Sequence, residues 1–86
     1  MPEICRFYGI VIRIFWREHG PPHFHAEYGE HEALIGIESL DILHGSLPAR
    51  ARRLIMEWAA EHRRELLENW ERAVNRQPLN EIEPLE

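Results

Sequence analysis

The sequence predicts a single α+β domain, an antiparallel meander of three or four strands packed against one long or broken C-terminal helix. Side chains in residues 8–37 alternate between apolar and polar, as they do in strands, whereas residues 46–77 repeat apolar side chains at helical spacing. A chain of 86 residues can build one small core. We therefore divide the domain into a β-meander (1–45), a helical region (46–77) and a C-terminal tail (78–86).

The first strand is predicted over residues 8–17, which are rich in β-branched and aromatic side chains. Arg13 lies on its mixed, polar face, together with Arg17. Gly20 and the two prolines that follow it cannot continue a strand ladder, so we expect a loop over residues 18–22. The apolar face of this strand would carry Tyr8, Ile10, Ile12, Ile14 and Trp16.

Residues 23–28 and 31–37 predict a β-hairpin. A turn of two residues at 29–30 keeps the apolar side chains of both strands on one face, and a turn of four residues does so as well. Two registers therefore stay open. In the shorter register the facing pairs are Phe24–Ile35, Ala26–Ala33, Tyr28–His31, His23–Gly36, His25–Leu34 and Glu27–Glu32.

Residues 40–44 are expected to form a weaker fourth strand or an extended connection. Pro48 then favours a helix start, and the apolar spacing continues to residue 76. Such a helix would be about 40 Å long, longer than the roughly 30 Å width of so small a body. It must either break near residues 62–64 or project with Trp70 towards a partner. The tail has an apolar residue at every third position, which suits a strap over the core or a docking peptide.

Composition excludes several classes of protein. The 44% hydrophobic and 29% charged content indicates a soluble domain, and no apolar run approaches the roughly 18 residues of a membrane span. The N-terminus lacks the pattern of a secretory signal, and the lone Cys5 cannot form an internal disulfide, so we expect a cytoplasmic protein. The net charge of −5 argues against broad, salt-driven binding of nucleic acids.

The proline pair that precedes His23 opens the most informative segment of the chain. In a strand, His23 and His25 share one face, close enough for both rings to bind one divalent ion such as zinc. A zinc site needs at least three protein ligands. The third would come from loop residues 18–19 or, across the hairpin, from Glu32 or Glu38. The metal-binding alternative that we carry forward consists of His23, His25 and Glu32.

A second use of this strand needs no cofactor. His23 and His25 could move protons while Arg13 or Arg17 stabilises charge on a phosphate, which is the minimal equipment for cleaving a phosphodiester. Gly36 would leave room for a substrate opposite His23. The structural alternative is a solvated sheet face on which Arg13 sits between two glutamates.

The chain resembles a small bacterial family, that of domain of unknown function 4160. The resemblance covers nearly the whole sequence, and Pro21-Pro22-His23-Phe24-His25 is its most specific block. It implies a partner encoded by a neighbouring gene, in an arrangement like a toxin–antitoxin pair, and a nuclease-like or regulatory role. It supplies no catalytic residues. The other segments that carry it are residues 6–13, Leu47-Pro48, Glu57-Trp58, residues 65–70 and residues 82–85.

The leading functional hypothesis is therefore a component of a toxin–antitoxin-like two-gene module that binds a small partner protein. RNA-directed activity would come from His23, His25 and Arg13, without a cofactor. A homodimer through the long helix is a further possibility, and membrane association is not expected. The alternative is a small zinc-type metal-binding protein. The expected partner-binding residues are Trp70, Leu79, Ile82 and Leu85.

Overall fold

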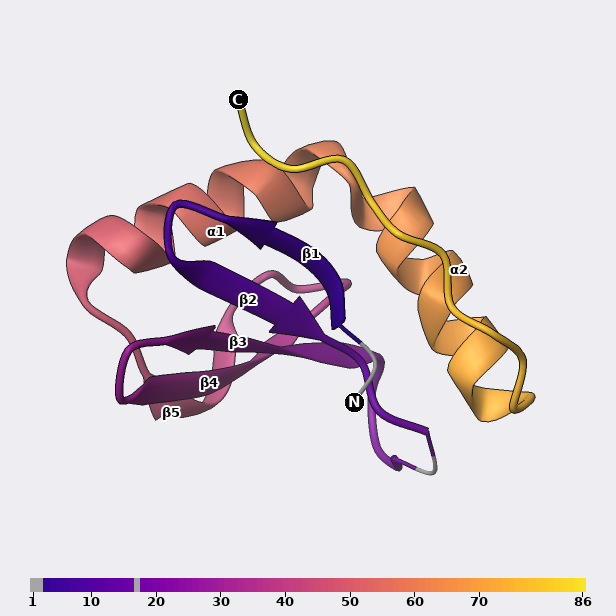
Figure 1. Ribbon diagram of the computed structural model, residues 1–86. Helices are drawn as coiled ribbons and strands as arrows, with labels where there is room; N and C mark the ends of the chain where they lie inside the picture. Colours follow the sequence, from indigo (N-terminus) through magenta and orange to yellow (C-terminus); the bar gives the residue numbers. More distant parts are fainter. Residues whose placement is uncertain (1–2, 17) are drawn as a thin grey trace.

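The computed structural model describes residues 3–16 and 18–86. These residues form a five-stranded antiparallel sheet in the order β1-β2-β3-β4-β5, followed by two helices (Figure 1). The α+β class is as predicted, and the described sheet is a meander with more strands than expected. The elements are β1 (Glu3–Phe7), β2 (Ile10–Arg13), β3 (His23–Tyr28), β4 (His31–Gly36), β5 (Ile42–Ser46), α1 (Ala49–Glu61) and α2 (Arg63–Val74).

The start of the sheet differs from the prediction. Instead of one strand over residues 8–17, the chain forms the hairpin β1–β2, which turns at Tyr8 and Gly9. Both residues have positive φ, 49° and 81°, as a two-residue hairpin turn requires. Tyr8 (55% exposed) and Trp16 (42% exposed) are therefore not on the core face. The isoleucines at positions 10, 12 and 14 are fully buried, as expected. Arg17 lies outside the described residues.

The hairpin β3–β4 has the shorter of the two predicted registers. Tyr28 pairs with His31, so the turn contains only Gly29 and Glu30, and Gly29 has the positive φ that such a turn favours. The following strand begins later than predicted, at Ile42 rather than at residue 40. The reason is a turn after β4 in which Leu40 has φ 55° and donates its N–H to the carbonyl of Gly36.

The helical region is broken, as one of the two alternatives predicted. α1 ends and α2 begins at His62, whose φ of −118° is not helical. The molecule measures 33 × 25 × 23 Å, shorter than the helix of about 40 Å that residues 48–76 would form unbroken. The projecting alternative is wrong, because Trp70 is buried. A homodimer through a long helix stays a prediction, now without the continuous helix on which it was based.

The C-terminal tail is a strap over the core. In Figure 1 it runs along α2 and returns past β1 towards α1. Ile82 donates its N–H to the carbonyl of Ile4 (2.9 Å), and the indole of Trp58 donates to the carbonyl of Glu83 (2.8 Å). The buried amide of Asn69 makes two further hydrogen bonds with the backbone of residue 80. Since a buried polar group left without a partner costs about 1–3 kcal/mol, these bonds fix the path of the tail.

The core lies between the apolar face of the sheet, both helices and the tail. Trp58 is fully buried and contacts the rings of Phe7 and Phe24. Burial raises the pKa of the Cys5 thiol to about 11, so this thiol stays protonated and is a poor metal ligand at neutral pH. Neither of the described helices is long and apolar enough to cross a membrane.

Candidate metal centre

Strand β3 presents its two histidines on one side, as its alternation predicts. Phe24 and Ala26 point into the core and are fully buried, whereas the rings of His23 and His25 lie together on the opposite face, 5.5 Å apart between centroids. The cross-strand neighbour of His25 on β2 is Arg13. Two imidazoles are thus held side by side by the strand geometry alone.

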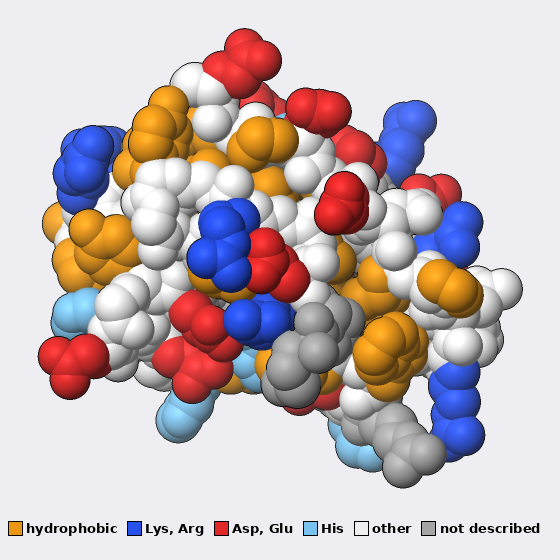
Figure 2. Space-filling view, in the orientation of Figure 1, with side chains coloured by type: hydrophobic (Ala, Val, Ile, Leu, Met, Phe, Trp, Pro, Cys, Tyr) orange, Lys and Arg blue, Asp and Glu red, His pale blue; other side chains and the backbone are white. Residues whose placement is uncertain are grey.

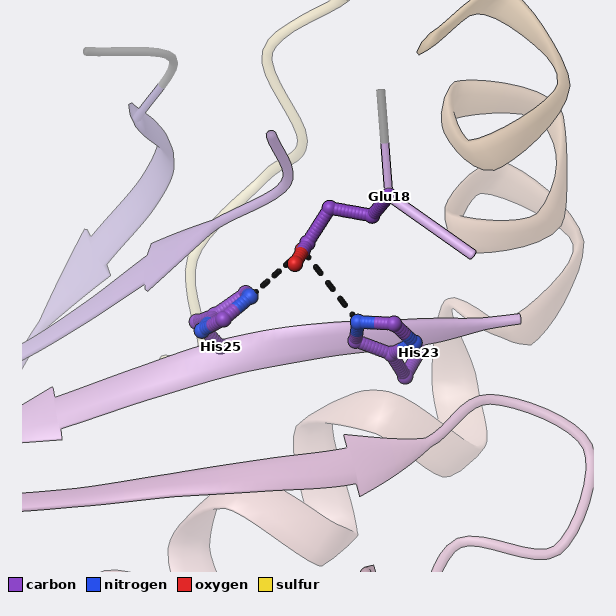
Figure 3. A group of neighbouring side chains, drawn as sticks. All are labelled: Glu18, His23 and His25. Carbon is purple, nitrogen blue, oxygen red and sulfur yellow. Dashed lines mark hydrogen bonds and ion pairs between the residues drawn. The ribbon is translucent and has the colours of Figure 1, made fainter. Parts of the chain in front are cut away.

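The loop between β2 and β3 adds a carboxylate to this pair. Glu18 Oε1 lies 3.2 Å from His23 Nε2 and 2.6 Å from His25 Nε2, so that one oxygen contacts both rings (Figure 3). Ligand atoms of the three side chains all lie within 4.8 Å of one another. The loop is anchored on its other side by Trp16, whose indole donates to the carbonyl of Gln77 (3.2 Å). Glu18, His23 and His25 form what we call the His–Glu cluster.

The proton positions on His23 follow from its neighbours. Its Nδ1 lies 2.9 Å from the carbonyl oxygen of Pro21, which can only accept a hydrogen bond, so Nδ1 carries a proton. In a neutral ring the lone pair is then on Nε2, facing the carboxylate oxygen of Glu18. Two lone pairs repel each other. A further proton, on the ring or on the carboxyl group, or a metal cation held by the two side chains would remove this repulsion.

His25 leaves a different group without a partner. Its Nε2 contacts Glu18, but its Nδ1 is buried and makes no hydrogen bond within the described part of the chain. The carboxylate of Glu32 on β4 comes within 4.0 Å of this Nδ1, just beyond hydrogen-bond distance. A buried polar atom without a partner is unusual in a protein and asks for an explanation.

Aromatic rings cover the cluster. Trp70 of α2 lies 4.8 Å from the ring of His23, and Phe15 makes an edge contact with His25 at 4.6 Å between centroids. The side chains of His23 and His25 are only 5% and 12% exposed, whereas Glu18 is 27% exposed. The imidazoles therefore lie in apolar surroundings, and the carboxylate faces solvent.

The other residues expected at this site are placed nearby. Arg13 lies beside His25, but its Nε donates to Glu27 at 3.1 Å, so its charge is already paired. Glu32 is 59% exposed and approaches the Nδ1 side of His25, away from the nitrogen that contacts Glu18. The structure thus brings Glu18, rather than Glu32, to the shared side of both rings. Glu18 is one of the loop residues that the sequence offered as a third ligand, although Glu32 was the one carried forward.

Some carboxylates elsewhere on the protein surface are paired with arginine. Figure 2 shows a group of basic and acidic side chains in contact near the centre of the face seen in Figure 1. One such pair joins Arg6 and Glu3 at 2.8 Å, and the hydrogen bond from Arg6 lowers the pKa of the Glu3 carboxyl below its ordinary value. Carboxylates that already pair with arginine are poor candidates for a metal site, unlike Glu18.

The residues expected to bind a partner lie against the protein's own core. Trp70 and Ile82 are buried, and Leu79 and Leu85 are half-buried and pack on the core. Their role in binding a partner stays a prediction, and mainly the outer sides of the two leucines remain accessible for it. Sequence reasoning did not identify Phe15 and Trp70 as the aromatic cover of the His–Glu cluster, since no local pattern marks contacts between distant segments.

Comparison with known proteins gives one match. The model of the family described as domain of unknown function (DUF4160) matches residues 9–71, which include the whole His–Glu cluster. No curated protein and no solved structure matches this chain. Because the matched residues make up well over half of the sequence, the chain belongs to the DUF4160 family.

Proposed function

We propose that this protein binds a divalent metal ion of the zinc type through Glu18, His23 and His25. The observation that carries the proposal is the convergence of two imidazole nitrogens on one carboxylate oxygen, at 2.6 and 3.2 Å. Two histidines and one glutamate form a recurrent ligand set of catalytic zinc sites, in which water or substrate occupies the fourth position. A cation held by these atoms is one of the ways to remove the lone-pair repulsion between His23 and Glu18, the other being an additional proton.

The surroundings of the cluster support the same proposal. Metal-bound histidines usually donate their second N–H to a carbonyl or carboxylate, which fixes the ring. His23 already has this arrangement through Pro21. His25 has Glu32 within 4.0 Å of the equivalent nitrogen. The second ring nitrogen of His23 therefore already has a hydrogen-bond partner, and that of His25 has a candidate partner 4.0 Å away.

Calorimetric titration of the purified, chelator-treated protein with Zn²⁺ tests this proposal. We expect one equivalent of Zn²⁺ to bind. Glu18→Gln should weaken Zn²⁺ binding by more than the factor of about 10 to 100 that is typical when a residue hydrogen-bonded to a metal ligand is changed. Glu65→Gln is the matched control, because Glu65 also lies 2.6 Å from a histidine nitrogen but contacts only that one ring. Absence of saturable binding, or equal binding by the two variants, would contradict the proposal.

A second candidate function is binding of a small partner protein, as a component of a toxin–antitoxin-like two-gene module. It is favoured by exposed apolar side chains around the C-terminal end of α2, where Val74 is 59% exposed and Trp16 lies beside Pro78 and Leu79 in one shallow groove. RNA-directed activity through His23 and its neighbours belongs to this candidate.

Co-purification with the product of the adjacent gene tests the second candidate. We expect Val74→Glu to reduce recovery of the complex severalfold, since a charge would be buried in the interface. Leu43→Glu, a similar change at an exposed apolar side chain of β5, should leave recovery unchanged. Failure of the wild-type chain to retain the neighbouring product, or equal recovery of both variants, would count against this candidate.

A further inference from the structure

A groove of about 470 Å³ lies beside Glu18 of the His–Glu cluster. Its other lining residues are His19, Val74 and Arg76. In Figure 1 the loop that follows β2 extends beside the C-terminal end of α2, and the groove lies between these two segments. Glu18 is thus shared, since its carboxylate contacts both histidines and the same side chain lines the groove.

Arg76 occupies an unusual backbone position at the end of α2. Its N–H bonds to the carbonyl of Ala73 (3.1 Å), and the N–H of Gln77 bonds to the carbonyl of Arg72 (2.8 Å). This pattern closes a helix with a left-handed residue, usually glycine, and Arg76 takes that position with φ 58°. A non-glycine residue is strained there. Backbone strain is often kept at functional sites, so the side chain of Arg76 is a candidate functional group of the groove.

The charges around the groove are not neutralised by each other. Glu18 and Arg76 line the same groove, and no ion pair joins them in the described part of the chain. When Glu18 binds a divalent cation, its negative charge is compensated by the metal. The groove then has the metal-bound Glu18 and Arg76 among its lining residues, which together form a positively charged region within an acidic protein.

From this arrangement we infer that the groove binds a phosphate oxyanion, with one oxygen on the metal and others on Arg76. The inference rests on the proposed metal-binding function. A guanidinium presents forked donors that match phosphate oxygens, and a metal with an open position binds a further oxygen. The groove is within the size range of small-molecule sites, so an organic group esterified to the phosphate can lie against Val74.

The test uses the full chain loaded with Co²⁺, whose visible absorption reports changes in coordination. Phenyl phosphate and a short oligouridylate are titrated separately, because a phosphate can belong to a small monoester or to an RNA backbone. Each probe that binds should change the cobalt spectrum. Stronger binding of phenyl phosphate identifies a small monoester as the ligand, and stronger binding of the oligouridylate identifies RNA.

Arg76→Gly is the informative variant, since glycine suits the left-handed backbone and the change removes the guanidinium without straining the fold. We expect phosphate affinity to fall about tenfold, as for loss of one charge-assisted hydrogen bond, while cobalt affinity stays unchanged. Arg64→Ala, which removes an exposed arginine at the other end of α2, should bind phosphate like the wild type.

The outcomes separate the two proposals. If the wild-type protein binds no cobalt, the metal-binding function and the phosphate site both fail. If cobalt binds but neither phosphate probe changes its spectrum, or if Arg76→Gly and Arg64→Ala bind phosphate equally, the phosphate site is overturned while the metal-binding function stands.

Discussion

His25 and His62 each place a ring nitrogen 2.6 Å from a glutamate oxygen, yet the two contacts lie in different surroundings. Glu65 is three residues from His62, on the first turn of α2, and is half exposed. Glu18 reaches His25 from a separate loop, beneath aromatic side chains, and the same oxygen also contacts His23. The contact of His62 is a local feature of a helix start, whereas that of His25 depends on how the loop before β3 folds back over this strand.

The difference shows what marks a candidate ligand set. Distance between one histidine and one carboxylate does not distinguish the two places. Convergence of several ligand atoms does distinguish them, because a pair of oppositely charged neighbours on a helix is common and contributes little to stability. The His–Glu cluster also has outer contacts that orient a ring, through the carbonyl of Pro21, and the His62 pair has none of this kind among the described contacts.

The largest effect expected from this comparison is on the free energy of unfolding. His23→Ala should destabilise the protein by about 2–4 kcal/mol, because it leaves a cavity beside Trp70 and removes the donor to the Pro21 carbonyl. His62→Ala should cost less, about 1–2 kcal/mol, since its ion pair is local and its ring loses packing mainly against Trp58. Urea denaturation in the presence of chelator measures both values without a contribution from bound metal.

Equal losses for the two alanine variants would break the comparison, since the buried cluster would then be no more important to the fold than a local helical pair.

A smaller effect would sharpen the comparison by testing the outer contacts. If a metal occupies Nε2 of His25, the ring proton must lie on Nδ1, which then needs an acceptor. Glu32 is within 4.0 Å of this atom. We expect Glu32→Ala to weaken Zn²⁺ binding about tenfold, at the lower end of the range for outer partners. Glu30→Ala, at an exposed position in the adjacent turn, should bind zinc like the wild type, and identical affinities would remove this role of Glu32.

Much of the fold follows from local patterns in the sequence. A slip of β3 against β4 by one residue can be excluded because it would move Phe24 and Ala26 out of the core, but the choice between the two remaining registers needed the structure. The length of the helix against the size of the body left two outcomes, a break near residues 62–64 or a projecting end, and the structure has the break, at His62. The β1–β2 hairpin was not predictable in this way, because Tyr8-Gly9 is a weaker turn signal than Asn-Gly and the alternation of side chains continues through it.

The candidate site was predictable only in part. Alternation in β3 places His23 and His25 on one face, and this required nothing beyond the strand. The third member depended on a loop, so several acidic residues competed for the position and only the folded structure brings Glu18 to it. Arg76 gave no signal in the sequence, because its importance lies in the path of the backbone after α2 and in the groove that this path creates.

The strap formed by the tail has a consequence for how the protein is made. The outer edge of β1 is covered by residues near position 82, so during translation this edge stays open until almost all the described chain has been synthesised. A truncated product that stops before Leu79 would keep an unpaired strand edge and an exposed Trp58 indole. Such edges are templates for aggregation, so incomplete nascent chains of this protein should be prone to form insoluble deposits.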